Sequence, residues 1–333
     1  MNQNTISIIV PAYNIAPYLP RCLESLITQT FRQLEIIVVD DGSTDETGAI
    51  IDNWAGKDSR IKAIHKENGG VSSARMAGIA AATGEWIGFV DGDDYAEPEM
   101  FAHLLKNAQE HGADISHCGY QMVFPDGHID MYYNTGRKEL FDHEVGMQAL
   151  LRGDYVEPGL WNKLFRRDVV LGFECSSMWD SSICYNEDLL MNYILFDRAK
   201  RSVYEDIPFY HYMLRYGSAV AVSTPKLYKV RDPLRVMELI LEDAKNTRSV
   251  YPLAAERYLR VLIGAVQQTD WPEEAATAKQ KLRQRLPEFR KLPGISQKVT
   301  LMAFGVAYLQ PVYKLVRNMY NRFTGIDKKY DLE

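Results

Sequence analysis

Residues 86–94 read WIGFVDGDD, an apolar run that leads directly into three acids and a glycine. Such a short, continuous apolar run indicates a strand buried on both faces. Asp91 and Asp93 therefore project from a fixed backbone toward the same side of the protein. Neighbouring carboxylates repel unless a proton or cation lies between them, so both are candidate ligands of Mg²⁺ or Mn²⁺. A solvated acidic loop before a helix is the alternative interpretation of these residues alone.

The preceding sequence repeats this arrangement of an apolar run followed by polar residues. Further strands are expected at Ile6–Val10, Glu35–Asp40 and Arg60–His65, and helices at 17–26, 43–54 and 71–82. Ser43 and Glu46 match a capping box that would open the second helix. Strands alternating with helices predict a mostly parallel sheet covered on both faces, with ligands at the carboxyl ends of its strands. The polar segments at those ends are Pro11–Asn14, Asp40–Ser43, Asn68–Gly70 and Asp91–Asp94.

The remaining chain adds mixed structure and then helices. We expect a helix after Pro98, a strand from Asp114 and a turn at 125–127 between two extended runs. Further helices are expected at 140–152 and 185–198, with an extended segment at 203–214. From residue 225 the pattern predicts helices at 226–245, 252–268, 273–286 and 295–322. The expected division is 1–110, 111–224 and a helical extension over 225–333.

Charge separates the first two parts from the last. The net charge is −6, yet residues 1–224 hold 18 Lys and Arg against 32 Asp and Glu, whereas residues 225–333 hold 20 against 12. The acidic part is a poor nucleic-acid binder, and the basic part suits an anionic surface. The four cysteines lack a CxxC pair, and the N-terminus does not resemble a signal peptide. These features favour a cytoplasmic protein without a disulfide framework.

The segment 299–313 contains 15 uncharged residues between Lys298 and Lys314. A membrane-spanning helix needs about 20 residues, and Pro311 interrupts this run. Two interpretations stay open: an amphipathic helix that lies at a membrane surface, and a core helix of a small bundle.

Several residues at the strand ends suit a nucleotide. Tyr13 is placed to stack on a base, and Asp41 to accept a hydrogen bond from a pyrimidine imide. Arg75 is placed to donate to a phosphate oxygen. Gly69 and Gly70 allow close approach of the backbone to a ligand. Simple packing of Tyr13, a turn role for Asp41 and a carboxylate partner for Arg75 are the alternatives.

The blocks SIIVPAYN, EIIVVDDGSTDET, ENGGVSSARMAGIAAATGEW and IGFVDGDDY resemble the signature segments of inverting family 2 glycosyltransferases. The resemblance is dense over the first 110 residues. It continues more loosely to about residue 215 through WNKLF at 161–165, the Asn186–Asp188 segment and YHYMLRYGS at 210–218. It implies the GT-A fold, with a nucleotide-sugar half followed by an acceptor half. The nucleotide-sugar contacts that it implies are Pro11, Tyr13, Asp41, Arg75, Asp91 and Asp93.

The resemblance also implies individual roles. Asp93 would ligate the metal, and Asp91 would support the ribose or the metal. Asp188 would be the catalytic base, because direct displacement at the anomeric carbon requires a group that removes the acceptor proton. Trp161 and Lys163 resemble acceptor-side positions, and Glu187 is the acid most easily confused with Asp188. A loop containing His211, Arg215 and Tyr216 would close over the diphosphate, although His211 is better explained as a core histidine.

The expected protein is an inverting glycosyltransferase that uses Mn²⁺ or Mg²⁺. It would transfer a hexose or N-acetylhexosamine from a UDP-sugar to a glycan hydroxyl, with an undecaprenyl-diphosphate-linked acceptor in lipopolysaccharide, capsule or exopolysaccharide synthesis. A nicotinamide-dependent enzyme and a P-loop enzyme are excluded because GxGxxG and GxxxxGK[ST] are absent. The main alternative is a non-catalytic nucleotide- or carbohydrate-binding protein on the same fold.

Overall fold

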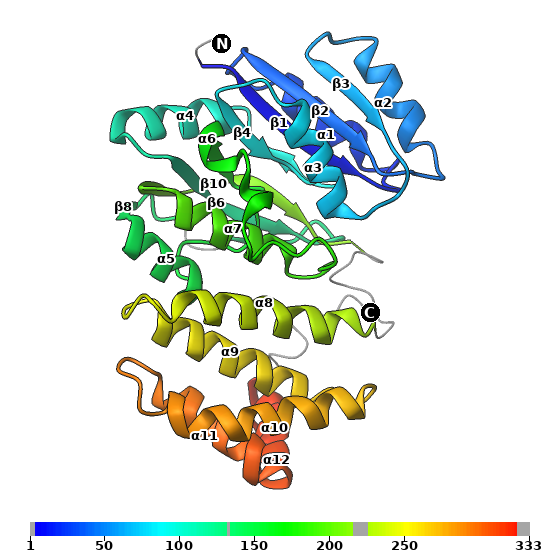
Figure 1. The fold of residues 1–333 in the computed structure, drawn as a ribbon. Coiled ribbons are helices and arrows are strands. Elements are labelled where there is room, and N and C mark those ends of the chain that lie inside the picture. The colour runs from blue at the N-terminus through cyan, green and yellow to red at the C-terminus, as the bar shows by residue number, and fades with distance from the viewer. Residues whose placement is uncertain (1–3, 132–133, 216–225, 325–333) are drawn as a thin grey trace. The chain divides into compact units, whose positions relative to one another are not determined.

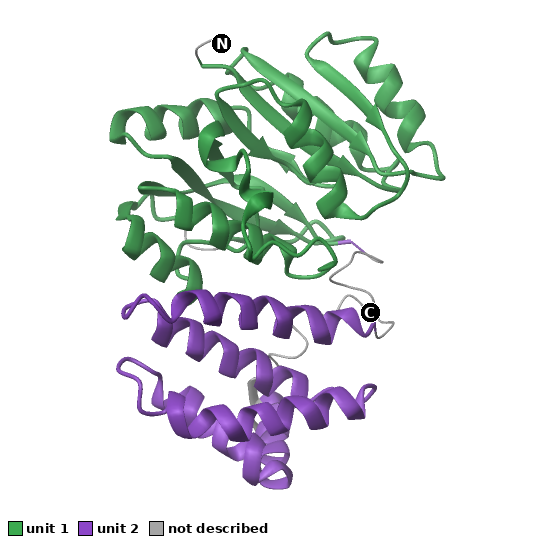
Figure 2. Ribbon diagram, viewed as in Figure 1, with its two compact units in different colours: residues 1–214 green, residues 215–333 purple. Residues whose placement is uncertain are grey.

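The computed structural model describes residues 4–131, 134–215 and 226–324. The chain forms two compact units, Met1–Leu214 and Arg215–Glu333 (Figure 2). The first unit contains both segments expected to bind substrates, with the anticipated boundary near residue 110 inside it. The expected boundary at residue 224 lies outside the described residues.

The first unit is built on a mixed sheet (Figure 1). Its strands are β1 (Ile6–Ala12), β2 (Leu34–Asp40), β3 (Ile61–His65), β4 (Trp86–Phe89), β5 (Tyr95–Ala96), β6 (Ile115–Val123), β7 (Ile129–Met131), β8 (Lys138–Asp142), β9 (Lys163–Arg166) and β10 (Arg201–Met213). The main order of the strands is β3-β2-β1-β4-β9-β6-β10-β5. Outside this order, β7 pairs with β6, and β8 pairs with β10.

The four N-terminal strands confirm the expected parallel arrangement. Strand β1 pairs in parallel with β2 and β4, and β2 pairs in parallel with β3. Every residue of β2 is buried, as the apolar run 36–39 predicts for its centre. Side chains of β1 and β2 form one core with those of α1 (Leu19–Ile27) and α4 (Met100–His111). The carboxyl ends of β1, β2 and β4 therefore meet at one edge of the sheet.

The second half of the sheet breaks the parallel pattern. Strand β9 runs antiparallel to both β4 and β6, so it joins the two parallel groups. The sequence did not predict this strand within WNKLF, and the structure buries its lysine, Lys163. The turn at 125–127 connects β6 and β7 as expected, and their pairing is antiparallel.

The helices of this unit follow the expected order with shifted ends. They include α2 (Thr47–Ala55), α3 (Val71–Ala81), α5 (His143–Arg152) and α7 (Glu187–Arg198), whereas the short α6 (Arg167–Val170) was not predicted. The predicted capping box is wrong: α2 begins at Thr47, and the Ser43 hydroxyl accepts the backbone N–H of Asn14 instead. Long-range contact with another strand end thus replaces the local cap.

The second unit is helical as expected. It contains α8 (Tyr228–Ala244), α9 (Tyr251–Val266), α10 (Pro272–Phe289), α11 (Gln297–Tyr308) and α12 (Gln310–Thr324). The single helix expected over 295–322 is two helices, with the break at Leu309 and Pro311 in the first turn of α12. This placement suits proline, which needs no intrahelical donor there. Over the described ranges, no helix is both long and apolar enough to cross a bilayer.

Candidate active site

The turn after β2 is held by the carboxylate of Asp41, which is buried. Its Oδ1 accepts the backbone N–H of Gly69 at 3.0 Å and the Lys66 ammonium at 2.6 Å, while Oδ2 accepts the N–H of Gly70 at 2.7 Å. These contacts fix the loop before α3, which carries Arg75. Asp41 therefore shapes the edge of the site, and little of its carboxylate stays accessible to a nucleotide base.

Pro11 and Tyr13 lie at the end of β1. Pro11 pairs with Val39 of β2, and the Tyr13 side chain is 49% exposed. The adjacent Asn14 has a positive φ of 50°, and its side-chain oxygen accepts the backbone N–H of Thr44 at 2.8 Å. The turn is thus anchored beside an accessible aromatic ring, which is the arrangement that stacking on a base requires.

The acidic loop after β4 is positioned by a tyrosine from β10. The Tyr210 hydroxyl donates to Asp94 Oδ2 at 2.8 Å and accepts the backbone N–H of Asp91 at 3.2 Å. Asp94 Oδ1 also accepts the N–H of Met213 at 2.7 Å. Burial and the nearby charges of Asp93 and Asp91 raise the pKa of Asp94 well above its usual value. Asp94 and Tyr210 thus fix the Asp91–Asp93 segment, a role that sequence analysis missed.

Gly92 is required between the two acids by close packing. A Cβ atom at this position would lie 2.5 Å from the Ile15 side chain and 3.0 Å from the Pro11 carbonyl oxygen. The loops after β1 and β4 are therefore in direct contact. This contact brings the expected base-binding and metal-binding segments together.

Arg75 connects the end of β4 with the start of α7. Its guanidinium donates to Glu187 Oε1 at 2.9 Å and to Asp91 Oδ1 at 3.3 Å, although 112 residues separate it from Glu187. Burial opposes its charge, but Asp91, Glu187 and Asp188 outweigh that effect and raise the pKa of Arg75. The sequence anticipated a phosphate contact for Arg75 and offered a carboxylate partner as the alternative. The structure contains two carboxylate partners.

Asp188 lies beside this ion cluster, in the first turn of α7. The helix follows Asn186, which has a left-handed backbone with φ of 63°. Asp188 Oδ1 accepts the backbone N–H of Leu189 at 2.7 Å. Burial and the charge of Glu187 raise the pKa of Asp188 to about 7, while Arg75 opposes this rise. A carboxylate with this pKa is suited to accept a proton near neutral pH.

Asp91 and Asp93 fit a divalent cation that shares its coordination with a substrate. Burial raises the pKa of Asp91, Arg75 lowers it and Asp93 raises it further. The described residues contain no group of three or more metal-ligating side chains. Mg²⁺ and similar cations commonly use one or two carboxylates, with phosphate oxygens and water completing the shell. The donor set therefore suits a cation bound together with a diphosphate, and not a cation held by protein alone.

Trp161 and Lys163, the residues expected on the acceptor side, lie at the start of β9 in different environments. Trp161 is partly buried and stacks on Tyr210, with ring centroids 4.6 Å apart. Lys163 is fully buried, and its ammonium donates to Glu157 O at 2.8 Å, Gly159 O at 2.6 Å and Asn162 Oδ1 at 2.8 Å. Burial lowers the pKa of Lys163 to about 7, against the opposing charge of Glu157. A direct acceptor contact would require this ammonium to leave all three partners.

The Lys163 ammonium and α7 hold the same loop. Asn192 of α7 donates to the carbonyl oxygens of Pro158 and Gly159. Gly159 O thus receives hydrogen bonds from both Lys163 and Asn192. This network connects β9 to the helix that begins with Glu187 and Asp188. A lysine amid apolar residues in WNKLF was the available signal for such a buried anchor.

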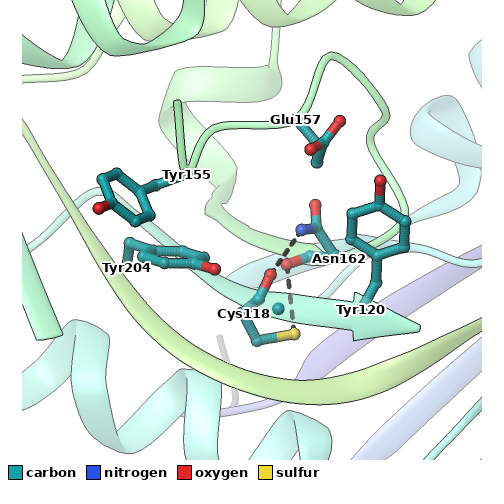
Figure 3. A pocket seen from close by; sticks show the side chains of 7 residues that line it. Cys118, Tyr120, Tyr155, Glu157, Asn162 and Tyr204 are labelled. Atoms are coloured by element: carbon teal, nitrogen blue, oxygen red, sulfur yellow. Dashed lines mark hydrogen bonds between the residues drawn. The ribbon is translucent and has the colours of Figure 1, made fainter. Parts of the chain in front are cut away.

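A narrow pocket, partly open to solvent and with room for about one water molecule, lies next to that loop (Figure 3). Its labelled lining residues are Cys118, Tyr120, Tyr155, Glu157, Asn162 and Tyr204. Asn162 Nδ2 donates to the Cys118 carbonyl oxygen at 2.6 Å, and this hydrogen bond connects the residue just before β9 to β6. None of the site acids Asp91, Asp93 and Asp188 lines this pocket. It is separate from the cluster that these acids form with Arg75.

The expected closing loop is only partly described. His211 is buried, stacks on Tyr95 at 4.0 Å and contacts Glu97 Oε1 through Nε2 at 2.5 Å. Burial lowers the pKa of His211 despite the Glu97 contact. It is therefore a core histidine in this structure. Tyr216 lies outside the described residues.

Comparisons with known proteins agree with this arrangement. The sequence model of Glycosyl transferase family 2 matches residues 7–171, and the chain belongs to this family. The putative glycosyltransferase EpsH of Bacillus subtilis is 34% identical over 235 residues, covering 69% of this chain and 66% of EpsH. The uncharacterized glycosyltransferase EpsJ of the same organism is 37% identical over 203 residues, covering 59% of this chain and 57% of EpsJ. The chain thus spans less than two thirds of the length of these relatives.

The fold is also similar to solved structures of S. aureus TarS. The structure of TarS 1-349 in complex with UDP has a TM-score of 0.66 and 21% sequence identity, covering 96% of this chain and 92% of that chain. The complex of TarS 1-349 with UDP-GlcNAc has a TM-score of 0.67 with the same identity and coverage. This likeness confirms the GT-A fold expected from the sequence.

Proposed function

We propose that the chain transfers a sugar from a UDP-sugar to an acceptor hydroxyl, with inversion at the anomeric carbon. The observation that carries the proposal is the Asp91–Arg75–Glu187 ion cluster beside Asp188. It joins the acidic end of β4 to an acid whose pKa of about 7 suits a general base. The UDP and UDP-GlcNAc complexes of the structurally similar TarS support a UDP-sugar donor.

In this mechanism the carboxyl ends of β1 and β2 hold the base of the nucleotide, and the carboxyl end of β4 holds the diphosphate. Tyr13 stacks on the base beside Asp41, and Asp91 and Asp93 would hold Mn²⁺ or Mg²⁺ next to the diphosphate. Such a cation, when bound, offsets the charge that develops on the departing diphosphate. Arg75 supplies a fixed positive charge between the two halves, which limits repulsion among Asp91, Glu187 and Asp188.

Asp188 accepts the proton of the acceptor hydroxyl as its oxygen attacks the anomeric carbon. The attack occurs on the face opposite the bond to UDP, so one displacement inverts the configuration. Glu187 remains paired with Arg75 and is therefore poorly placed to serve as the base. Its negative charge keeps the pKa of Asp188 high.

The proposed acceptor is a hydroxyl of a growing glycan on a lipid carrier such as undecaprenyl diphosphate. The exposed basic and apolar helices of the second unit support an acceptor at an anionic bilayer, as does the similarity to bacterial glycosyltransferases. The chain would then act in the synthesis of lipopolysaccharide, capsule or exopolysaccharide, at the inner face of the cell membrane.

The test is UDP release from UDP-glucose, UDP-galactose, UDP-GlcNAc and UDP-GalNAc by the full chain with Mn²⁺. We expect one donor to yield UDP, with loss of the signal in EDTA and recovery with added Mn²⁺. Asp188→Asn is expected to bind UDP normally and release none. UDP binding without turnover of any donor, with or without glycan acceptors, would favour the non-catalytic binding protein and overturn the proposal.

A further inference from the structure

The end of the second unit exposes an unusual concentration of large apolar side chains. Helices α11 and α12 leave eight of them accessible between residues 301 and 319, and Leu301 and Met319 are 72% and 64% exposed. The eight are Leu301, Phe304, Tyr308, Leu309, Val312, Leu315, Val316 and Met319. A patch of this kind on a soluble domain marks an interaction surface.

Helix α11 has two apolar faces with different environments. Val299, Ala303, Val306 and Ala307 are buried in the unit. Leu301, Phe304 and Tyr308 recur at the i, i+3, i+7 spacing on an exposed face. The buried face agrees with the interpretation of a core helix, and the exposed face is available to an external surface.

Helix α12 is anchored at its start and exposed beyond it. Gln310 accepts the Lys279 ammonium at 2.6 Å, and a Cβ atom at Gly305 would lie 3.2 Å from the Tyr313 ring. At 100° per residue, Val312, Leu315, Val316 and Met319 of α12 fall within an arc of about 100°, and the exposed Leu309 lies at the break just before this helix. Arg317 and Arg322 flank this arc on its two sides, as in helices that lie at a lipid headgroup boundary.

The charge of this region selects among possible occupants. Residues 296–324 contain no Asp or Glu, and their cations are Lys298, Lys314, Arg317 and Arg322. An isologous contact with a second copy would place these like charges near one another, which is unfavourable. An anionic lipid surface complements them and accepts the apolar arc at the same time.

We propose that α11 and α12 form a lipid-binding surface whose apolar side chains enter the headgroup boundary of an anionic bilayer. The 15 residues of α12 extend about 22 Å, which suits a helix lying in the membrane plane. Leu315 and Val316 lie within the inserted arc, and Arg317 and Arg322 contact lipid phosphates at its margins. The proposal does not depend on the sugar-transfer reaction.

The test is sedimentation of the full chain with vesicles, with no donor or acceptor present. We expect strong binding to mixed phosphatidylcholine and phosphatidylglycerol vesicles, weak binding to phosphatidylcholine alone, and partial release in high salt. Replacing Arg317 and Arg322 together by Gln should lower the partition coefficient by about 25-fold, on the order of fivefold per cation. The matched control Arg248→Gln changes an exposed arginine outside these helices and should have little effect.

Val316→Asp tests the apolar part of the surface. It places a charge inside the arc and should abolish vesicle binding, whereas Val145→Asp, on an exposed helical position of the first unit, should not. Equal melting temperatures would show that both variants fold. Unchanged vesicle binding in Val316→Asp would overturn the proposal. The proposal would also be overturned if the wild type failed to bind vesicles and formed oligomers in ultracentrifugation that Val316→Asp converts to monomers. That result would identify a second copy of the chain as the occupant of the surface.

Discussion

The pH dependence of turnover should respond in opposite directions to the two charged neighbours of Asp188. Its pKa of about 7 places the acid limb of kcat near neutral pH, because only the carboxylate form accepts the acceptor proton. At pH 6 roughly a tenth of the enzyme retains this form. In Glu187→Gln one negative neighbour is removed and Arg75 loses a partner, and both changes lower the pKa of Asp188.

The expected displacement of the acid limb in Glu187→Gln is roughly one pH unit toward lower pH. This displacement corresponds to an increase of about fivefold in relative turnover at pH 6, where kcat is compared with its plateau at high pH. In Arg75→Gln the cation that opposes the rise is removed, so the limb should move by a similar amount toward higher pH. Glu110→Gln, an exposed acid on α4, is the control and should leave the limb in place.

The assay is UDP release at saturating donor and acceptor across the pH range, with UDP affinity measured at each pH. The affinity measurement separates an effect on turnover from an effect on nucleotide binding, since Arg75 also contacts Asp91. Acid limbs that move in the same direction in Glu187→Gln and Arg75→Gln would refute the reasoning. A limb that neither substitution moves would show that another group controls it.

Three further predictions concern single side chains. Asp188→Asn should reduce transfer by about a thousandfold, because the acceptor hydroxyl loses its general base. The affinity for UDP, measured by calorimetry, should stay within about twofold of the wild type. A parallel loss of UDP affinity would contradict the role of Asp188 as base. Asp93→Asn should raise the Mn²⁺ concentration for half-maximal turnover by about tenfold or more, and an unchanged Mn²⁺ requirement would remove Asp93 from the metal site. Lys163→Met should lower the free energy of unfolding by about 1–3 kcal/mol in denaturant titration, because the Glu157 carbonyl loses its donor and the Gly159 carbonyl keeps only Asn192. A stability equal to that of the exposed control Lys106→Met would contradict the anchoring role.

The first half of the fold could be predicted because its signals are local. The runs before Pro11, Asp40 and Asp91 are mostly apolar, and polar residues follow each of them within a few positions. The prediction at Ser43 failed because its hydroxyl bonds to Asn14, a partner 29 residues away that no local pattern reveals. The antiparallel insertion of β9 likewise depends on long-range pairing.

The residues of the candidate site could be predicted from the sequence, but the contacts between them could not. The acids Asp91, Asp93 and Asp188 could be selected from their motifs, whereas their link through Arg75 depends on a contact across 112 residues. The same limit applies to Tyr210, whose hydroxyl orients Asp91 and Asp94 from a distant strand. Sequence patterns thus identified the chemistry of the side chains, and tertiary packing determined their partners.

The central claim is that the carboxyl ends of β1, β2 and β4 hold a UDP-linked diphosphate through a divalent cation. A crystal structure of the full chain with UDP and Mn²⁺ tests it most directly. We predict Mn²⁺ bound to the Asp93 carboxylate at about 2.1–2.2 Å, with diphosphate oxygens in its shell and the uracil against Tyr13. Nucleotide bound elsewhere on the chain, or at this edge without Mn²⁺ on either Asp91 or Asp93, would contradict the account.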